Sequence, residues 1–220
     1  MNLVSAHLPL PWLWTFWLSA LALGGVMLRR ASWAMLRDAR NLNVFLAATV
    51  VVLALWQIKT GIKPGLALHL LGATGLTLMF RPLFALLAMA LITTLLGLWQ
   101  GDYSAIAGNF LLMGALPVGV SWGVYRLVDR RLPNHFFVYI FLNAFFGAAL
   151  ATLAVGLCAT GIAALAGLYR LDYLLENYLP FYLLLAWAEA FATGMLVTLM
   201  VVWKPEWVST FDDRRYLLNK

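Results

Sequence analysis

The chain has 220 residues, of which 64% are hydrophobic and 11% charged, and its mean hydropathy is +0.87. A soluble domain is about 45–50% apolar and about 25% charged, so this composition excludes an ordinary soluble protein. The single cysteine, Cys158, excludes an intramolecular disulfide and a zinc cluster built from cysteines. The net charge of +6 could indicate nucleic-acid binding, or the basic residues could instead set a membrane topology; their positions decide between the two.

Seven apolar segments approach the length of about 20 residues that a membrane-spanning helix needs. In chain order they cover residues 11–28, 42–58, 65–80, 82–99, 107–127, 136–168 and 178–203. The third and fourth are joined by Phe80-Arg81-Pro82, where the proline ends one helix and begins the next. The third is short enough to be tilted, broken or partly inserted, and the sixth is predicted to form one long helix.

The basic residues predict the orientation of these segments. With the N-terminus outside, 12 of the 15 Lys and Arg residues lie on the inner side and 3 on the outer side. The inner residues are Arg29, Arg30, Arg37, Arg40, Arg81, Arg126, Arg130, Arg131, Lys204, Arg214, Arg215 and Lys220, and the outer ones are Lys59, Lys63 and Arg170. The positive-inside rule therefore explains the charge without a nucleic-acid partner.

These patterns together predict the fold class and the location. We expect an all-α, multi-pass bundle of about seven transmembrane helices in the lipid of the cytoplasmic (inner) membrane, with the N-terminus outside and the C-terminus inside. Residues 1–220 would form a single transmembrane domain with a short cytoplasmic tail, 204–220. The N-terminal segment, 1–10, is too short and too polar at its start to span the membrane, and we expect it to fold back into the bundle.

His69 is the first candidate functional residue. It lies within the third segment, four residues after Gly65 and three before Gly72, so on a helix the three residues would share one face. That face is nearly bare of side chains, and another segment could approach the imidazole closely. His69 is either a metal ligand or proton carrier, or a histidine bonded to a neighbouring carbonyl inside the bundle.

Glu189 and Asn109 are the other polar candidates. An ionised carboxylate at the centre of a bilayer costs on the order of 3 kcal/mol or more, so Glu189 should face the bundle. Because basic residues are almost absent from the predicted helices, a protonated or hydrogen-bonded acid is expected rather than an ion pair. Asn109, at the start of the fifth segment, could cap a helix, bond across helices or offer a carbonyl oxygen to a cation.

Small residues predict where helices pack closely. Ala20 and Gly24 form a small-xxx-small pair in the first segment, and a second stripe runs along the sixth. The members of that second stripe, spaced by four and three residues, are Gly147, Ala151, Ala154, Cys158 and Gly161. They would contact other helices of the chain or a partner subunit. Neither a Ser-His-Asp nor an HExxH arrangement is present, and nothing in the sequence predicts an enzyme.

Several short motifs also occur in a fixed order along the chain. They are Met1–Pro9 ending in Leu8-Pro9, His69-Leu70-Leu71-Gly72, Gly108-Asn109 with Met113-Gly114, Leu179-Pro180, Glu189 through Gly194, and Pro205-Glu206. In order and spacing they resemble the CbiM family, the substrate-binding membrane subunits of cobalt- and nickel-type energy-coupling-factor transporters. Members of that family open with Met-His and carry a glycine-flanked histidine on a later helix.

The resemblance implies a ligand set for a divalent transition-metal ion bound as substrate. In the family the metal is held by the N-terminal amine, by the amide and imidazole of a histidine at position 2, and by the helix histidine. Carried over, the metal ligands are Met1, Asn2 and His69. Asn2 cannot supply an imidazole nitrogen, so His7 is a candidate replacement. Asn109 and Glu189 would support the site from outside the ligand set.

The resemblance also implies the function. The chain would be the substrate-binding subunit of an energy-coupling-factor transporter for a small cation such as cobalt or nickel. A separate coupling transmembrane subunit and cytoplasmic ATPase subunits would power it, because the chain has no nucleotide-binding motif. Two alternatives remain open: a non-transporting membrane scaffold or sensor that keeps the fold, and a subunit for a small organic substrate.

Overall fold

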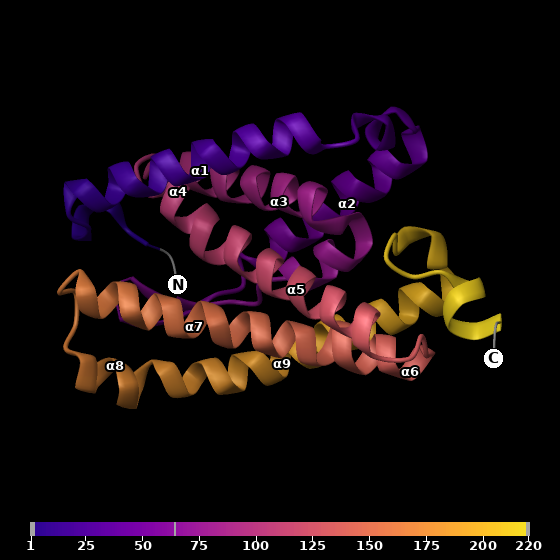
Figure 1. The fold of residues 1–220 in the computed structure, drawn as a ribbon. Coiled ribbons are helices and arrows are strands. Elements are labelled where there is room, and N and C mark those ends of the chain that lie inside the picture. The colour runs from indigo at the N-terminus through magenta and orange to yellow at the C-terminus, as the bar shows by residue number, and fades with distance from the viewer. Residues whose placement is uncertain (1–2, 64, 219–220) are drawn as a thin grey trace.

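The computed structural model describes residues 3–63 and 65–218, and most of them belong to helices (Figure 1). The main helices are α1 (Leu10–Arg30), α2 (Ala39–Leu55), α3 (Ala73–Gln100), α4 (Ile106–Asn109), α5 (Leu116–Arg131), α6 (Phe136–Val138), α7 (Gly147–Leu165), α8 (Leu171–Asn177) and α9 (Leu179–Trp203). Stretches of π-helix, Phe110–Ala115 and Tyr139–Phe146, join α4 to α5 and α6 to α7. Strands β1 (Thr60–Lys63) and β2 (Leu66–Leu68) form an antiparallel pair. Short 3-10 turns cover Ser5–His7, Trp33–Arg37 and Pro205–Trp207, and a last π-helical stretch covers Arg214–Leu218.

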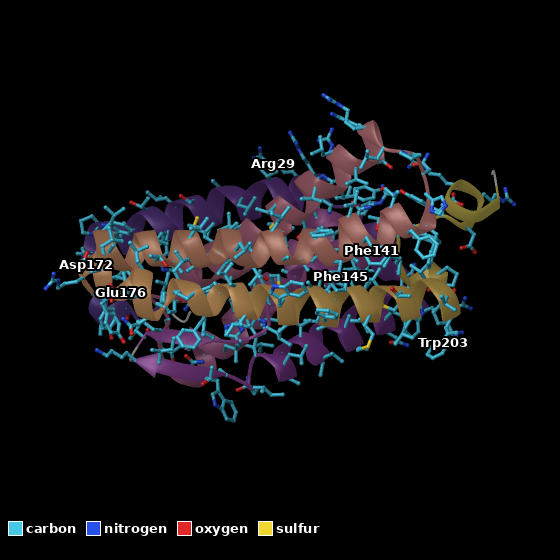
Figure 2. All side chains as sticks on the ribbon, turned by 90° about the horizontal axis from the view of Figure 1, so that it is seen from below. Arg29, Phe141, Phe145, Asp172, Glu176 and Trp203 are labelled. Carbon is cyan, nitrogen blue, oxygen red and sulfur yellow. The ribbon has the colours of Figure 1, made fainter. Side chains whose placement is uncertain are left out.

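The helices have the length and composition of membrane spans. Within the described part of the chain, 5 helices are long and apolar enough to cross a bilayer, and α2 is a shorter apolar helix. The five spans are Leu10–Arg30, Ala73–Gln100, Ile106–Arg131, Phe136–Leu165 and Leu171–Trp203. This confirms the all-α membrane bundle and the single long helix predicted for the sixth segment. Asp172 and Glu176 lie at one end of the bundle and Trp203 at the other (Figure 2).

The third predicted segment is not a continuous helix, so the helical face proposed for Gly65, His69 and Gly72 is wrong. The chain forms the hairpin of β1 and β2, with Thr60 opposite Leu68, and α3 begins only at Ala73. Gly65 (φ +78°) and Gly72 (φ +68°) have left-handed backbone conformations, which a helix does not allow. His69 therefore lies in a short coil between β2 and α3.

Helix α3 itself has two arms that meet at Arg81, whose φ of 61° interrupts the helix before Pro82. The ring of Phe45 on α2 contacts both Phe80, in the first arm, and Phe84, in the second. The break thus falls where the sequence predicted one helix to end and the next to begin.

The chain from β1 to the break at Arg81 runs along the bundle. Its first half is the hairpin and the coil after it, and its second half is the first arm of α3. At one end, Lys63 lies over the ring of Tyr173, 4.2 Å from its centroid, near the start of α8. At the other end, the Thr210 N–H and hydroxyl both donate to the carbonyl of Leu78.

Helix α7 packs between α5 and α9, and its buried surface differs from the predicted stripe. Gly147 and Ala151 are buried as expected, but Ala154 is only half-buried and Cys158 is exposed. Because α7 packs against two helices, a broad arc of its own surface is buried. This arc includes larger residues such as Thr152 and Val155, which a search for small residues alone does not find. Among the glycines of α7, Gly156 has the closest neighbour, Tyr182 of α9.

The small-residue pair of the first helix also behaves differently from the prediction. Ala20 and Gly24 face the bundle, but they line a cavity of about 220 Å³ shared with Phe84 and Phe110. No atom lies within 4 Å of a Cβ added at Gly24, so no close helix contact occurs there within the described part of the chain. Helix α1 is mostly exposed along its length, with Met27 its one buried residue.

Candidate metal-binding site

His69 is buried in the coil that follows β2, with 4% of its surface exposed. Its Nδ1 lies 3.0 Å from the carbonyl oxygen of Leu70. A carbonyl oxygen can only accept, so Nδ1 carries the proton and Nε2 presents a lone pair. Among the described residues Nε2 has no hydrogen-bond partner. A neutral imidazole with one nitrogen bonded to a backbone carbonyl and the other free is the arrangement that metal-binding histidines use.

Trp56 holds the coil from the side of α2. Its indole Nε1–H donates to the carbonyl of Leu71 at 3.0 Å, and its ring lies 4.5 Å from the His69 ring, centroid to centroid. The role of Trp56 was not predicted, because nothing in a single sequence links the end of one helix to a coil 13 residues later. An indole next to an imidazole also limits the directions from which other groups can approach His69.

Glu189 holds the same coil from the side of α9. It is 2% exposed, its Oε2 accepts from the Leu71 N–H at 2.7 Å, and its Oε1 accepts from the Gly72 N–H at 2.7 Å. The hydroxyl of Thr193, one turn further along α9, also bonds to this carboxyl group. Glu189 thus faces the bundle as a hydrogen-bonded acid.

The described part of the N-terminal segment lies against α4 and the turn that precedes it. Leu3 is buried, its N–H donates to Asn109 Oδ1 at 2.7 Å, and its carbonyl accepts from Asn109 Nδ2 at 3.1 Å. The N–H of Ser5 donates to Asp102 Oδ2 at 2.9 Å. Asn109 therefore bonds across elements and holds the segment the way a neighbouring β-strand would.

Three of the predicted ligands cannot be placed fully. Met1 and Asn2 lie outside the described residues, and so does the side chain of His7, whose backbone ends the 3-10 turn Ser5–His7. The structure therefore does not test whether these residues and His69 come together.

A small cavity lies between the N-terminal segment and Trp56. Leu3, Val4, Trp56, Asn109 and Met113 are among the residues that line a cavity of about 30 Å³. Trp56 borders this cavity and also contacts His69, so the described part of the N-terminal segment approaches the histidine across the indole. Within residues 3–63 and 65–218 no three His, Cys, Asp or Glu residues gather as a metal site. A metal on His69 would therefore need donors from the backbone or from the first residues.

The helical bundle, with its buried site, is that of a multi-pass membrane protein. The chain belongs to the CbiM family: the family model described as the cobalt uptake substrate-specific transmembrane region matches residues 2–207. It is therefore a multi-pass membrane component of a metal transporter and not an enzyme.

Solved structures have the same fold. A truncated transition metal transporter superposes with a TM-score of 0.80 at 18% identity, covering 92% of this chain and 99% of its own. Another transition metal transporter gives a TM-score of 0.78 at 18% identity, covering 91% and 92%. At this identity the likeness concerns the fold. No curated protein matches the chain.

Proposed function

We propose that the chain is the substrate-binding subunit of an energy-coupling-factor transporter that takes up a divalent transition-metal ion such as cobalt or nickel. One observation supports this most strongly: the buried His69 directs a lone pair at Nε2 that meets no protein partner among the described residues. A buried polar atom without a partner costs about 1–3 kcal/mol, which a bound ion would offset.

The proposed ligands are nitrogen donors. His69 Nε2 would be joined by the Met1 amine and the backbone nitrogen of Asn2, with His7 as a fourth ligand. Nitrogen donors of this kind suit cobalt(II), nickel(II) and copper(II) better than hard cations such as magnesium. The pairing of Leu3 with Asn109 supports this set, because it fixes the residue next to Asn2 beside Trp56.

A cavity of about 30 Å³ beside Trp56 accommodates one or two water-sized groups, which suits an ion. The apolar cavity of about 460 Å³ between α2 and α9 falls within the range of about 300–1,000 Å³ for sites of organic ligands, so a subunit for a small organic substrate stays as a third candidate. The non-transporting scaffold or sensor remains the second candidate, and the presence of asparagine at position 2 is the observation that favours it.

The proposed partners are a coupling transmembrane subunit and cytoplasmic ATPase subunits in the inner membrane. The sequence contains no nucleotide-binding motif, so the energy for transport would come from other chains. The tail after α9 would lie on the cytoplasmic side with them.

Loss of the imidazole tests the proposed site directly. Protein purified in detergent, loaded with nickel or cobalt and desalted, should retain about one ion per chain. His69→Ala should lower this retention at least tenfold, because a buried ligand worth at least 1.4 kcal/mol is removed. His135→Ala is the matched control, since His135 caps α6 through its own Nδ1 and should leave metal content unchanged. Equal metal content in the His69→Ala variant and the wild type would refute the site.

The orientation is tested separately by cysteine labelling. In a Cys158→Ser background, Ala6→Cys and Ser209→Cys place thiols at two exposed positions on opposite sides of the predicted membrane. A membrane-impermeant maleimide should label position 6 in intact cells and position 209 only after permeabilisation. Labelling of both thiols in intact cells would contradict the positive-inside assignment.

A further inference from the structure

We propose that Glu189 is the positioning residue of the metal site, acting on His69 through the peptide bond between Leu70 and Leu71. This inference rests on the proposed function. The C=O of that peptide accepts the proton of His69 Nδ1 at 3.0 Å, and its N–H donates to Glu189 Oε2 at 2.7 Å. One planar group thus connects the carboxylate to the imidazole.

The next peptide bond repeats the arrangement. The C=O of Leu71 accepts from Trp56 Nε1 at 3.0 Å, and the N–H of Gly72 donates to Glu189 Oε1 at 2.7 Å. Each carboxylate oxygen therefore holds one of two consecutive peptide planes, and an aromatic nitrogen holds the opposite edge of each. With both planes fixed, the direction of the His69 ring is fixed as well.

The backbone needs this carboxylate because α3 begins inside the bundle. The first N–H groups of a helix have no partner within the helix, and Gly72, at the N-cap position, has no side chain to accept from them. Glu189 reaches this point from α9 and bonds the two N–H groups just before the helix. The positive end of the helix dipole also favours a negative charge there.

The apolar surroundings strengthen the coupling between Glu189 and His69 through this peptide bond. On the side away from the N-terminal segment, Glu189, Leu70 and Gly72 border a cavity of about 460 Å³ between α2 and α9 whose lining is almost entirely apolar. Hydrogen bonds in such low-dielectric surroundings polarise one another. A carboxylate that accepts from the peptide N–H makes the peptide C=O a better acceptor for Nδ1–H. This increases the electron density that Nε2 can offer to a metal.

Gly72 permits this geometry. Its φ of +68° turns the N–H toward Glu189, and an added Cβ would lie 2.9 Å from Cγ2 of Val52. A residue with a side chain would be strained in conformation and would collide with α2. Gly72 is therefore needed for the contact with the carboxylate, not for the approach of another segment to the imidazole, as the sequence predicted.

Glu189→Gln tests the role with the smallest change in shape. Glutamine offers one acceptor oxygen and directs its NH₂ group at the second N–H, so one of the two bonds is lost. We expect at least a tenfold loss of nickel affinity and a shifted imidazole ¹⁵N signal of His69 in metal-free protein, because the Nδ1–H form is less favoured. Glu189→Asp, one methylene shorter, should lie between the wild type and glutamine.

Thr210→Val controls for a general loss of stability. It removes the hydroxyl that donates to Leu78 and bonds Tyr139, at the far end of the same arm of α3. This variant should unfold at a lower temperature and yet keep nickel affinity within twofold of the wild type. Unchanged affinity and an unchanged ¹⁵N signal in Glu189→Gln would overturn the inference. If the wild type itself bound no metal, the proposed function would fail, and the ¹⁵N signal of metal-free protein would still decide the role of Glu189.

Discussion

Replacing Gly156 with leucine is expected to lower the free energy of unfolding by about 3 kcal/mol or more, at the upper end for overpacked cores. Even the first added carbon would lie 2.7 Å from Cδ1 and 2.8 Å from Cβ of Tyr182. That ring cannot move aside easily, because it is buried and its hydroxyl bonds the hydroxyl of Tyr178 at 3.0 Å. The substitution would therefore force α7 away from α9.

Thermal unfolding in detergent, followed by size-exclusion chromatography of heated samples, measures this effect. Gly161→Leu is the matched control, because it adds the same side chain to the same helix at a position with no atom within 4 Å. It should unfold at nearly the wild-type temperature. Similar unfolding temperatures for Gly156→Leu and Gly161→Leu would show that the contact between α7 and α9 is not close.

The helices were the most predictable part of the fold, because a bilayer fixes the length and apolar character of a span. The predicted segment 178–203 differs by one residue from α9, and 136–168 contains the long helix Phe136–Leu165. Breaks were visible too, since Arg81-Pro82 marks the point where the two arms of α3 meet. These features depend on local sequence and on hydropathy alone.

The hairpin before α3 was missed because apolarity does not distinguish a strand from a helix inside a membrane protein. Leu66–Leu68 is as apolar as its helical neighbours and forms β2. The dipeptide Pro64-Gly65 was the available signal, since proline followed by glycine is typical of turns. Gly65 and Gly72 were interpreted as small residues on a helix face, whereas both adopt positive φ.

The sequence marked the polar residues of the candidate site but not the bonds that connect them to the backbone. His69, Asn109 and Glu189 stood out because polar groups are rare in apolar segments. Their partners are distant in sequence: Glu189 bonds Leu71 across 118 positions, and Asn109 bonds Leu3 across 106. Such bonds involve backbone groups, which every residue has, so no pattern in a single sequence marks them.

Replacing Asn109 with leucine is expected to release the N-terminal segment and to lower nickel retention at least tenfold. The asparagine accepts from the N–H of Leu3 and donates to its carbonyl, and Leu3 is buried. Leaving either group unpaired costs about 1–3 kcal/mol, which is enough to disfavour the docked segment. If Met1 and Asn2 supply ligands, their position depends on this pair of bonds.

Two comparisons separate this effect from general damage to the protein. Asn109→Asp keeps the acceptor for the Leu3 N–H and loses only the donor, so its nickel retention should lie between leucine and wild type. Hydrogen exchange should report faster exchange at the Leu3 and Ser5 amides in Asn109→Leu, with slow exchange preserved along α7 and α9. Adding residues before Met1 should lower nickel retention by a larger factor in the wild type than in Asn109→Leu. In the variant the N-terminal segment is already released, so the addition has less to disturb. Full nickel retention in Asn109→Leu would mean that the metal, if bound at His69, takes its other ligands from elsewhere.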